Sequence, residues 1–312
     1  MAVKLYISRR GSSGLAASRC FSKKCKAEIS ILVVDAYSKQ GRQDLKKGGM
    51  SLAGKLYVDM LQRNSPIPVM TDIVYPADAE FEVPDLQKYS GVAWTGSSLT
   101  VYHDTQEVVQ QIDFSRKLFE DGIPQFGSCW ALQIAVMASY GECAKNPRGR
   151  EVGISRKIRL TPEGIAHPMF EGKRSTFDAF TSHDDEVTHL PPGAVLLAGN
   201  QHSSVQAATV THANGTFWAV QYHPEYNLGE LARLTECRRE KLLRQGFFKS
   251  NEAVDSYIEM LEAIDGSSTE TKDIQWLLGI DSDILDENYK CAEVKNWITK
   301  QAIPFGQCNG LI

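Results

Sequence analysis

The chain has 312 residues, of which 42% are hydrophobic and 23% are charged. These values are ordinary for a folded protein and exclude disordered and fibrous classes. Lys and Arg number 34 and Asp and Glu 38, so the net charge is −4, which argues against a nucleic-acid partner. No apolar stretch reaches about 18 residues, so no membrane partner is expected. Seven widely spaced cysteines argue against a disulfide scaffold or a zinc module and favour a reducing compartment.

Residues 1–28 differ from the rest of the chain, because basic residues dominate until the first acidic residue, Glu28. A basic composition that is rich in Ser and poor in acid is typical of a transit-type leader. The alternatives are a solvated tail or a start codon placed too far upstream, and the lack of an apolar secretory core favours these. We therefore expect a cytoplasmic, cytosolic protein whose N-terminal tail is dispensable for catalysis.

Residues 29–34 are apolar except for Ser30, and the run is closed by Asp35, which predicts a strand buried on both faces. Further elements follow in alternation: a helix over 51–61, strands over 69–75 and 91–94, a helix around 108–119, a strand over 123–127 and a helix over 130–140. Strands alternating with helices predict an α/β fold with a largely parallel central sheet flanked by helices.

After Arg150 the pattern changes to short strands separated by turn signals. We expect strands over 158–160, 177–181, 194–198, 205–210 and 217–222. Asn214-Gly215 between two apolar runs predicts a hairpin, so this part should form a smaller antiparallel sheet. Leucines recur at helical spacing from Leu228 onward. The predicted organisation is a tail (1–28), a catalytic domain (29–228) and a helical C-terminal extension (229–312).

Cys129 lies within the segment Phe126-Gly127-Ser128-Cys129-Trp130, between a predicted strand and a predicted helix. A nucleophile held at such a sharp turn is exposed at the end of the sheet. The helix N-terminus also favours a thiolate over a thiol. A buried structural cysteine is the alternative interpretation, since free cysteines are often buried.

His223 and Glu225 occur in Tyr222-His223-Pro224-Glu225, after the last predicted strand. In an extended segment, residues two apart point to the same side, so the two side chains should project together. A carboxylate beside an imidazole fixes its tautomer and stabilises the imidazolium. Together with Cys129, they would complete a nucleophile, a base and an orienting group.

The chain resembles the class I glutamine amidotransferases, in which a G-x-C-x-G-x-Q elbow and a later H-P-E tripeptide supply a Cys-His-Glu triad. The matching residues are Gly127, Cys129 and Gln133, the tripeptide His223-Pro224-Glu225, the segment Ser182–Val187 and the loop Thr95–Ser98. The resemblance covers about residues 29–228. It is greatest to the amidotransferase domain of GMP synthetase and its stand-alone relatives, including γ-glutamyl peptidases.

The resemblance implies roles for the matching residues. Cys129 would form a thioester with a γ-glutamyl group, His223 would protonate the leaving amine and activate water, and Glu225 would orient His223. The backbone N–H groups of Gly96 and Trp130 would form the oxyanion hole.

Other matching residues would bind the substrate. Gln133, Ser182 and His183 would contact its α-amino and α-carboxyl groups. Ala131 stands where the family usually has Gly, and we expect its methyl to lie beside the pocket. Ser97 likewise replaces the second Gly of the usual loop.

Three functions are compatible with these residues. The first is hydrolysis of a γ-glutamyl amide, either glutamine or a γ-glutamyl conjugate, by a stand-alone cysteine hydrolase. The second is an amidotransferase subunit that passes ammonia to a synthetase in trans, because the 82 residues 231–312 contain no Gly-rich phosphate loop. The third is a non-catalytic binding or regulatory protein. The expected ligand is a small γ-glutamyl molecule, and no cofactor or metal is expected.

Overall fold

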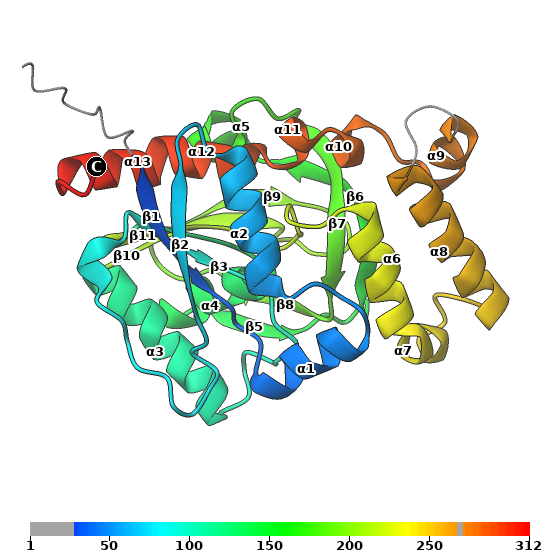
Figure 1. The fold of residues 1–312 in the computed structure, drawn as a ribbon, viewed down its shortest axis with the longest axis horizontal. Coiled ribbons are helices and arrows are strands. Elements are labelled where there is room, and N and C mark those ends of the chain that lie inside the picture. Colours follow the sequence, from blue (N-terminus) through cyan, green and yellow to red (C-terminus); the bar gives the residue numbers. More distant parts are fainter. Residues whose placement is uncertain (1–27, 267–270) are drawn as a thin grey trace, which may run out of the picture.

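The computed structural model describes residues 28–266 and 271–312, so the predicted tail lies outside the described residues except for Glu28. The fold is an α/β arrangement around one large sheet (Figure 1). Its strands are β1 (Ile29–Val34), β2 (Val69–Val74), β3 (Gly91–Trp94), β4 (Gln125–Ser128), β5 (Glu142–Lys145), β6 (Glu151–Leu160), β7 (Thr176–His183), β8 (Asp185–His189), β9 (Ala194–Gly199), β10 (Ala207–His212) and β11 (Gly215–Val220).

The described residues form a nine-stranded sheet in the order β2-β1-β3-β4-β11-β10-β9-β6-β7. From β2 through β1, β3 and β4 to β11, adjacent strands are parallel. From β11 through β10, β9 and β6 to β7, the same sheet continues in antiparallel pairs. A separate two-stranded antiparallel sheet joins β5 and β8. The predicted fold class is confirmed. The antiparallel strands after Arg150 mostly extend the central sheet, and they leave only β5 and β8 as a small second sheet.

Strand β1 is buried on both faces, as its largely apolar sequence predicts. Ile29, Ile31 and Val33 pack into one core cluster, whereas Leu32 and Val34 pack into another on the opposite face. Alternating side chains therefore tie a single strand to two helical layers.

A first set of helices lies in the chain between β1 and β7. They are α1 (Lys39–Lys47), α2 (Ala53–Asn64), η1 (Leu86–Lys88), α3 (Gln106–Glu120), α4 (Trp130–Ala138), α5 (Pro162–Ala166) and η2 (Pro168–Phe170). Helices α3 and α4 share one core cluster, and α2 lies in the other. Helix α1 and the strands β5 and β8 are elements that the sequence pattern did not predict.

The predicted hairpin joins β10 and β11, but its two turn residues are Ala213 and Asn214. Gly215 already pairs with His212 in the ladder. A Cβ on Gly215 would lie 2.9 Å from the Cα of Phe119, so glycine is needed there for close packing against α3.

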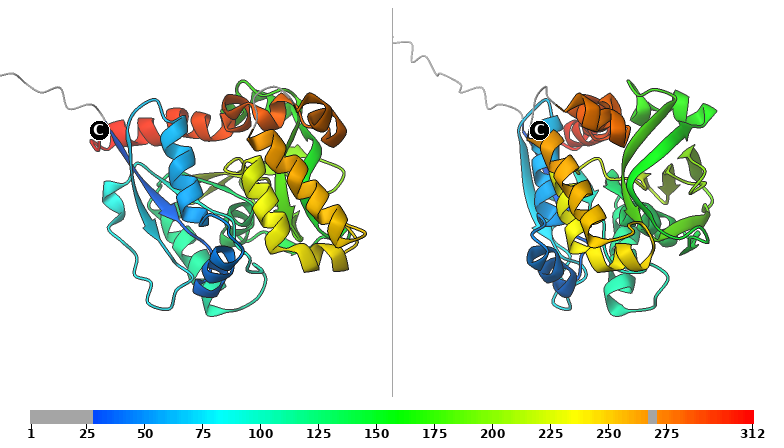
Figure 2. Two further views of the ribbon diagram at one scale, coloured as in Figure 1. Left: turned by 45° about the vertical axis from the view of Figure 1, so that its right-hand side comes forward. Right: turned by 90° about the vertical axis from the view of Figure 1, so that its right-hand side faces the viewer.

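The chain after β11 is helical, as predicted. Its elements are α6 (Leu228–Cys237), α7 (Arg239–Arg244), α8 (Asn251–Asp265), α9 (Lys272–Leu278), α10 (Ser282–Leu285), α11 (Glu287–Lys290), α12 (Ala292–Trp297), η3 (Ile298–Ala302) and α13 (Ile303–Cys308). Helices α6 and α8 pack side by side, and α10 to α13 run back along one edge of the body to end near β1 (Figures 1 and 2). Trp297 is fully buried in the same cluster as β1 and α2. Among the described residues, no helix has the length and apolarity needed to cross a membrane.

Candidate active site

Cys129 occupies a strained turn between β4 and α4. Its φ of 54° and ψ of −99° lie in a region that residues other than glycine rarely adopt, at a cost of about 1–3 kcal/mol. Its backbone N–H donates to the carbonyl of Val220 at 2.7 Å, which ties the turn to the end of β11. The turn also needs Gly127, because a Cβ there would lie 2.6 Å from the carbonyl oxygen of Trp94. The predicted elbow geometry is therefore present.

Ala131, the departure from the family elbow, lies in the core. It is fully buried, and a Cβ on Gly127 would come within 2.4 Å of its methyl. The expectation that this methyl lies beside the pocket is wrong, because the first turn of α4 directs it toward β4. Strand and helix pack closely here by pairing a glycine with an alanine.

His223 and Glu225 form a buried pair, with Nδ1 of His223 2.7 Å from Oε1 of Glu225. The pair does not arise from strand alternation, since β11 ends at Val220 and the tripeptide lies in a turn. The hydroxyl of Ser128 donates to both carboxylate oxygens at 3.2 Å. Tyr57 in turn donates to Ser128 at 2.5 Å. Glu225 is thereby held as an oriented acceptor for the imidazole.

The other ring nitrogen of His223, Nε2, is buried and has no hydrogen-bond partner among the described residues. Burial lowers the pKa of His223, but the negative charges of Glu225 and Cys129 outweigh burial and raise this pKa to about 10. The ring stacks on Tyr226 with a centroid separation of 4.2 Å and an interplanar angle of 2°. The imidazole therefore faces the thiol with one nitrogen fixed and one free, the arrangement that proton transfer requires.

Gly96 and Trp130 lie on either side of the nucleophile. A Cβ on Gly96 would lie 3.1 Å from Cε1 of His223 and 3.8 Å from Cβ of Cys129, so its backbone passes close to both side chains. Trp130 is the first residue of α4, where a backbone N–H has no carbonyl partner within the helix. Both backbones therefore lie next to Cys129.

A cavity of about 480 Å³ opens in front of Cys129. Its lining includes the residues Ser97, Ser98, Leu99, Thr100, Tyr102, Trp130, Gln133, Lys145, Arg150, Ser182, His183, Asp184, Asp185, Arg238, Lys241 and Gln245. Sγ of Cys129 lies 3.9 Å from the carbonyl oxygen of Ser182. The structure therefore brings the three predicted substrate-binding residues, Gln133, Ser182 and His183, to one cavity with the nucleophile.

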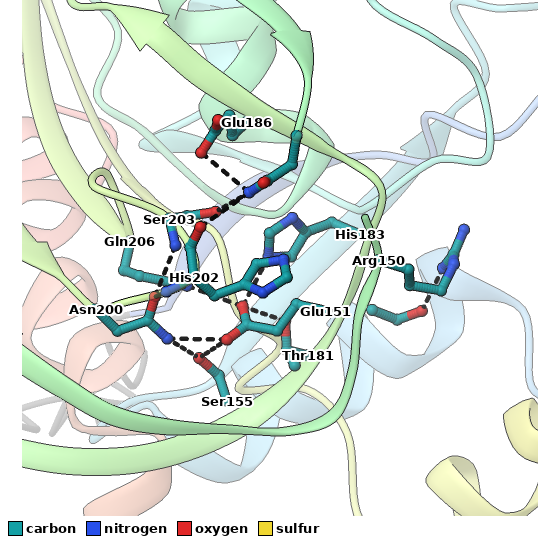
Figure 3. Close-up of polar contacts among 12 residues, drawn as sticks. Arg150, Glu151, Ser155, Thr181, His183, Glu186, Asn200, His202, Ser203 and Gln206 are labelled. Atoms are coloured by element: carbon teal, nitrogen blue, oxygen red, sulfur yellow. Dashed lines mark hydrogen bonds and ion pairs between the residues drawn. The ribbon is translucent and has the colours of Figure 1, made fainter. Parts of the chain in front are cut away.

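The side chain of His183 is engaged within the protein. Its Nδ1 lies 2.9 Å from the carbonyl of Asp185, and its Nε2 lies 2.9 Å from Oε2 of Glu151. Glu151 also accepts from Asn200 at 2.8 Å and Gln206 at 2.9 Å (Figure 3). This cluster fixes the segment that carries Ser182, and both ring nitrogens of His183 are already used in it.

Basic residues that sequence reasoning missed converge on Ser182. Arg150 donates to the Ser182 hydroxyl at 3.1 Å, and Arg238 donates to the same oxygen at 2.9 Å. Nζ of Lys241 lies 2.9 Å from Oδ2 of Asp184, and Asp184 also forms an ion pair with Arg150. Arg150 directly precedes β6 and Arg238 separates α6 from α7, and neither position is marked by a motif. In the described ranges, no group of His, Cys, Asp and Glu side chains is arranged to hold a metal ion.

Comparisons with known proteins identify the family of this chain. The family model for glutamine amidotransferase class-I matches residues 67–236. The chain is 31% identical to a gamma-glutamyl-L-1-hydroxyisopropylamide hydrolase from a Pseudomonas species, over 89% of this chain and 94% of that protein. It is also 30% identical to gamma-glutamyl peptidase 4 of Arabidopsis thaliana, over 59% of this chain and 71% of that protein.

A solved structure has the same fold. It is a glutamine amidotransferase from Thermotoga maritima, which aligns with a TM-score of 0.57 at 15% identity and covers 85% of this chain and 98% of its own. The residues matched by the family model include the elbow and the His-Pro-Glu turn. The chain therefore belongs to the class I glutamine amidotransferase family and is a glutamine amidotransferase-like hydrolase.

Proposed function

We propose that this protein hydrolyses a γ-glutamyl amide bond through a Cys129–His223–Glu225 triad. The observation that carries the proposal is the buried imidazole of His223, with Nδ1 bound to Glu225 and Nε2 unpartnered beside a cysteine at a strained elbow. An imidazole that served only the fold would have both nitrogens satisfied, since a buried polar atom without a partner is costly.

In the first step, the Cys129 thiolate attacks the γ-carbonyl carbon, and the backbone N–H groups of Gly96 and Trp130 stabilise the oxyanion. The C–N bond breaks as His223 gives its Nε2 proton to the leaving amine, which leaves a thioester. Water then gives a proton to His223 and adds to the thioester carbonyl. Release of the thiolate yields a γ-carboxylic acid, which gives its proton to solvent, and restores the imidazolium–thiolate pair.

The cavity favours a substrate that carries carboxylate groups. Its lining contains four basic side chains, Lys145, Arg150, Arg238 and Lys241, and two acidic ones. Burial, and next the charge of Arg238, lower the pKa of Arg150, because two guanidinium groups share one neutral hydroxyl. A carboxylate beside Ser182 would relieve this repulsion and accept hydrogen bonds from both arginines. Every γ-glutamyl group has such an α-carboxylate, and many leaving amines carry another.

Delivery of ammonia to a separate synthetase is the second candidate, because its first half-reaction is the same. Relatives named GMP synthase include one from Wolinella succinogenes that is 29% identical, but the match covers only 28% of that protein. The match to the Pseudomonas hydrolase extends over nearly the whole of both chains. This difference favours stand-alone hydrolysis.

Turnover by the isolated chain tests the choice. We expect glutamate release from glutamine or γ-glutamyl conjugates without a partner, and loss of this activity in Cys129→Ala. An electrophilic glutamine analogue should label Cys129. Labelling of Cys143 or Cys237 with Cys129 unmodified would reject the nucleophile, and turnover only with an added synthetase would favour the transfer subunit.

The role of the arginines is tested with Arg238→Met. We expect a higher KM for every γ-glutamyl amide if the guanidinium binds the α-carboxylate. A higher KM only for amides whose leaving amine carries a carboxylate would place the Arg238 guanidinium at that second carboxylate. The control is Arg239→Met, since Arg239 pairs with Asp255 at 2.6 Å and lies outside the cavity lining. Equal KM values for Arg238→Met and the unaltered protein would exclude either role.

A further inference from the structure

The back of the His-Pro-Glu turn is held by the C-terminal extension. The thiol of Cys291 donates to the carbonyl of Pro224 at 3.3 Å. Nζ of Lys290 donates to the carbonyl of Tyr226 at 2.7 Å. These two contacts come from adjacent residues at the junction of α11 and α12, and they bind the turn on either side of Glu225.

A third contact lies just before the turn. The hydroxyl of Tyr222 donates to Oε1 of Glu293, and both side chains are fully or almost fully buried. Lys173 lies 3.2 Å from the same carboxylate. Lys290, Cys291 and Glu293 thus make hydrogen bonds to Tyr226, Pro224 and Tyr222. These three residues follow, separate and precede His223 and Glu225.

Burial makes these contacts difficult to rearrange. Glu293 is 0% exposed and Lys290 is 7% exposed. A charge removed from water is tolerated only where its partners are well placed, and loss of one partner leaves the other uncompensated. Lys290 has the carbonyl of Tyr226 and, at 2.8 Å, the carboxylate of Glu287. The segment 222–226 is therefore held by directed hydrogen bonds in addition to apolar packing.

The held residues are those that set the position of the imidazole. Tyr226 supplies the ring on which His223 stacks, and its carbonyl is the acceptor for Lys290. Pro224 separates His223 from Glu225, and its carbonyl is the acceptor for Cys291. A shift of this turn would move both members of the pair relative to Cys129. Misplacement of a reacting group by about 1 Å can cost about 10²-fold in rate.

We propose that residues 290–293 act as a clamp that positions the His223–Glu225 pair, with Lys290, Cys291 and Glu293 as positioning residues. The clamp rests on the proposed triad, because it acts through His223. It gives the C-terminal extension a function in turnover in addition to its part in the core. None of these three residues lines the substrate cavity, so the clamp does not act by direct contact with a ligand there.

The test compares Lys290→Met with Asn296→Ala. Lys290→Met keeps the aliphatic stem and removes the ammonium. Asn296 lies on the next helix, α12, but its amide donates to the carbonyls of Met169 and Glu171, both at 2.9 Å, away from the turn. We expect Lys290→Met to lower kcat about tenfold or more, with KM for a γ-glutamyl amide little changed. Asn296→Ala should lower the melting temperature comparably and leave kcat unchanged, both assayed well below their melting temperatures.

A second measurement separates positioning from simple destabilisation. The double variant Lys290→Met/Glu225→Gln is compared with Glu225→Gln. If Lys290 acts through the pair, Lys290→Met should lower kcat much less in the Glu225→Gln protein than in the unaltered protein, because effects within one unit are not additive. Tyr222→Phe, a milder change, serves if Lys290→Met does not fold, and it too should lower kcat. Unchanged kcat in both folded clamp variants would overturn the clamp. Activity that survives Cys129→Ala would instead overturn the proposed triad, so the two failures are distinguishable.

Discussion

Two buried histidine–carboxylate pairs lie in different regions of this protein, and they have nearly the same separation. His223 is 2.7 Å from Glu225 beside the parallel strands, and His183 is 2.9 Å from Glu151 in the antiparallel part. Both imidazole side chains are almost completely buried. Their distances and burial therefore do not distinguish a reactive imidazole from a structural one.

The second ring nitrogen distinguishes them. His183 uses it to bind the carbonyl of Asp185, so the ring joins two segments and has no atom left for a substrate proton. His223 leaves Nε2 free beside Cys129. An imidazole whose two nitrogens both have hydrogen-bond partners contributes to the fold. An imidazole with one nitrogen unpartnered beside a nucleophile can transfer a proton.

Removal of the imidazole of His223 should have the largest effect on activity. We expect His223→Ala to lower kcat/KM by about 10²–10⁴-fold, since a positioned general acid and base is lost. Steady-state kinetics on a γ-glutamyl amide checks this, with circular dichroism as the test of folding. Unchanged activity in a folded variant would remove His223 from the mechanism.

Neutralisation of Glu225 should have a smaller effect on the same step. Glu225→Gln keeps the size of the side chain and an acceptor oxygen, but it loses the charge that raises the pKa of His223. We expect reduced kcat/KM with the fold intact, and a double variant little worse than His223→Ala alone. Losses that add in full would mean that Glu225 acts independently of His223.

The second pair should respond in stability. Burial raises the pKa of Glu151, but the hydrogen bond and charge of His183, with the amides of Asn200 and Gln206, outweigh it and lower this pKa to about 2. A carboxyl whose pKa is lower in the folded state contributes stability above its unfolded pKa, and that stability is lost as pH falls from about 4.5 to about 2.

We therefore expect Glu151→Gln to lower stability at pH 7 by about 1–3 kcal/mol, or several degrees in Tm. The difference in Tm from the unaltered protein should close as the pH approaches 2. Thermal unfolding followed from pH 7 downward measures this. A difference that stays constant with pH would show that the ionisation of Glu151 contributes nothing.

The smallest effect is expected from removal of residues 1–27. They precede β1 and have no periodic apolar pattern. A chain that begins at Glu28 should keep its kcat/KM and its Tm. A loss of several degrees on truncation would contradict this expectation.

The sequence by itself determined the local features of this protein. The apolar run of β1 predicted a strand buried on both faces, and Gly127 before Cys129 predicted the elbow. These are properties of neighbouring residues, because strand burial and the space required at a tight turn depend on a short stretch of chain. The pairing of His223 with Glu225 was predicted from the same kind of proximity, although the backbone achieves it through a turn.

Only the tertiary structure decided which distant residues meet. Glu151 and His183 are 32 residues apart and pair through the imidazole, while Arg150 and Arg238 reach the same Ser182 hydroxyl from separate elements. Lys290 lies 64 residues after the turn that it holds. A charged side chain has no sequence periodicity that reveals its partner. Its environment depends on chain packing, and the packing determines whether a polar atom is satisfied or left free to react.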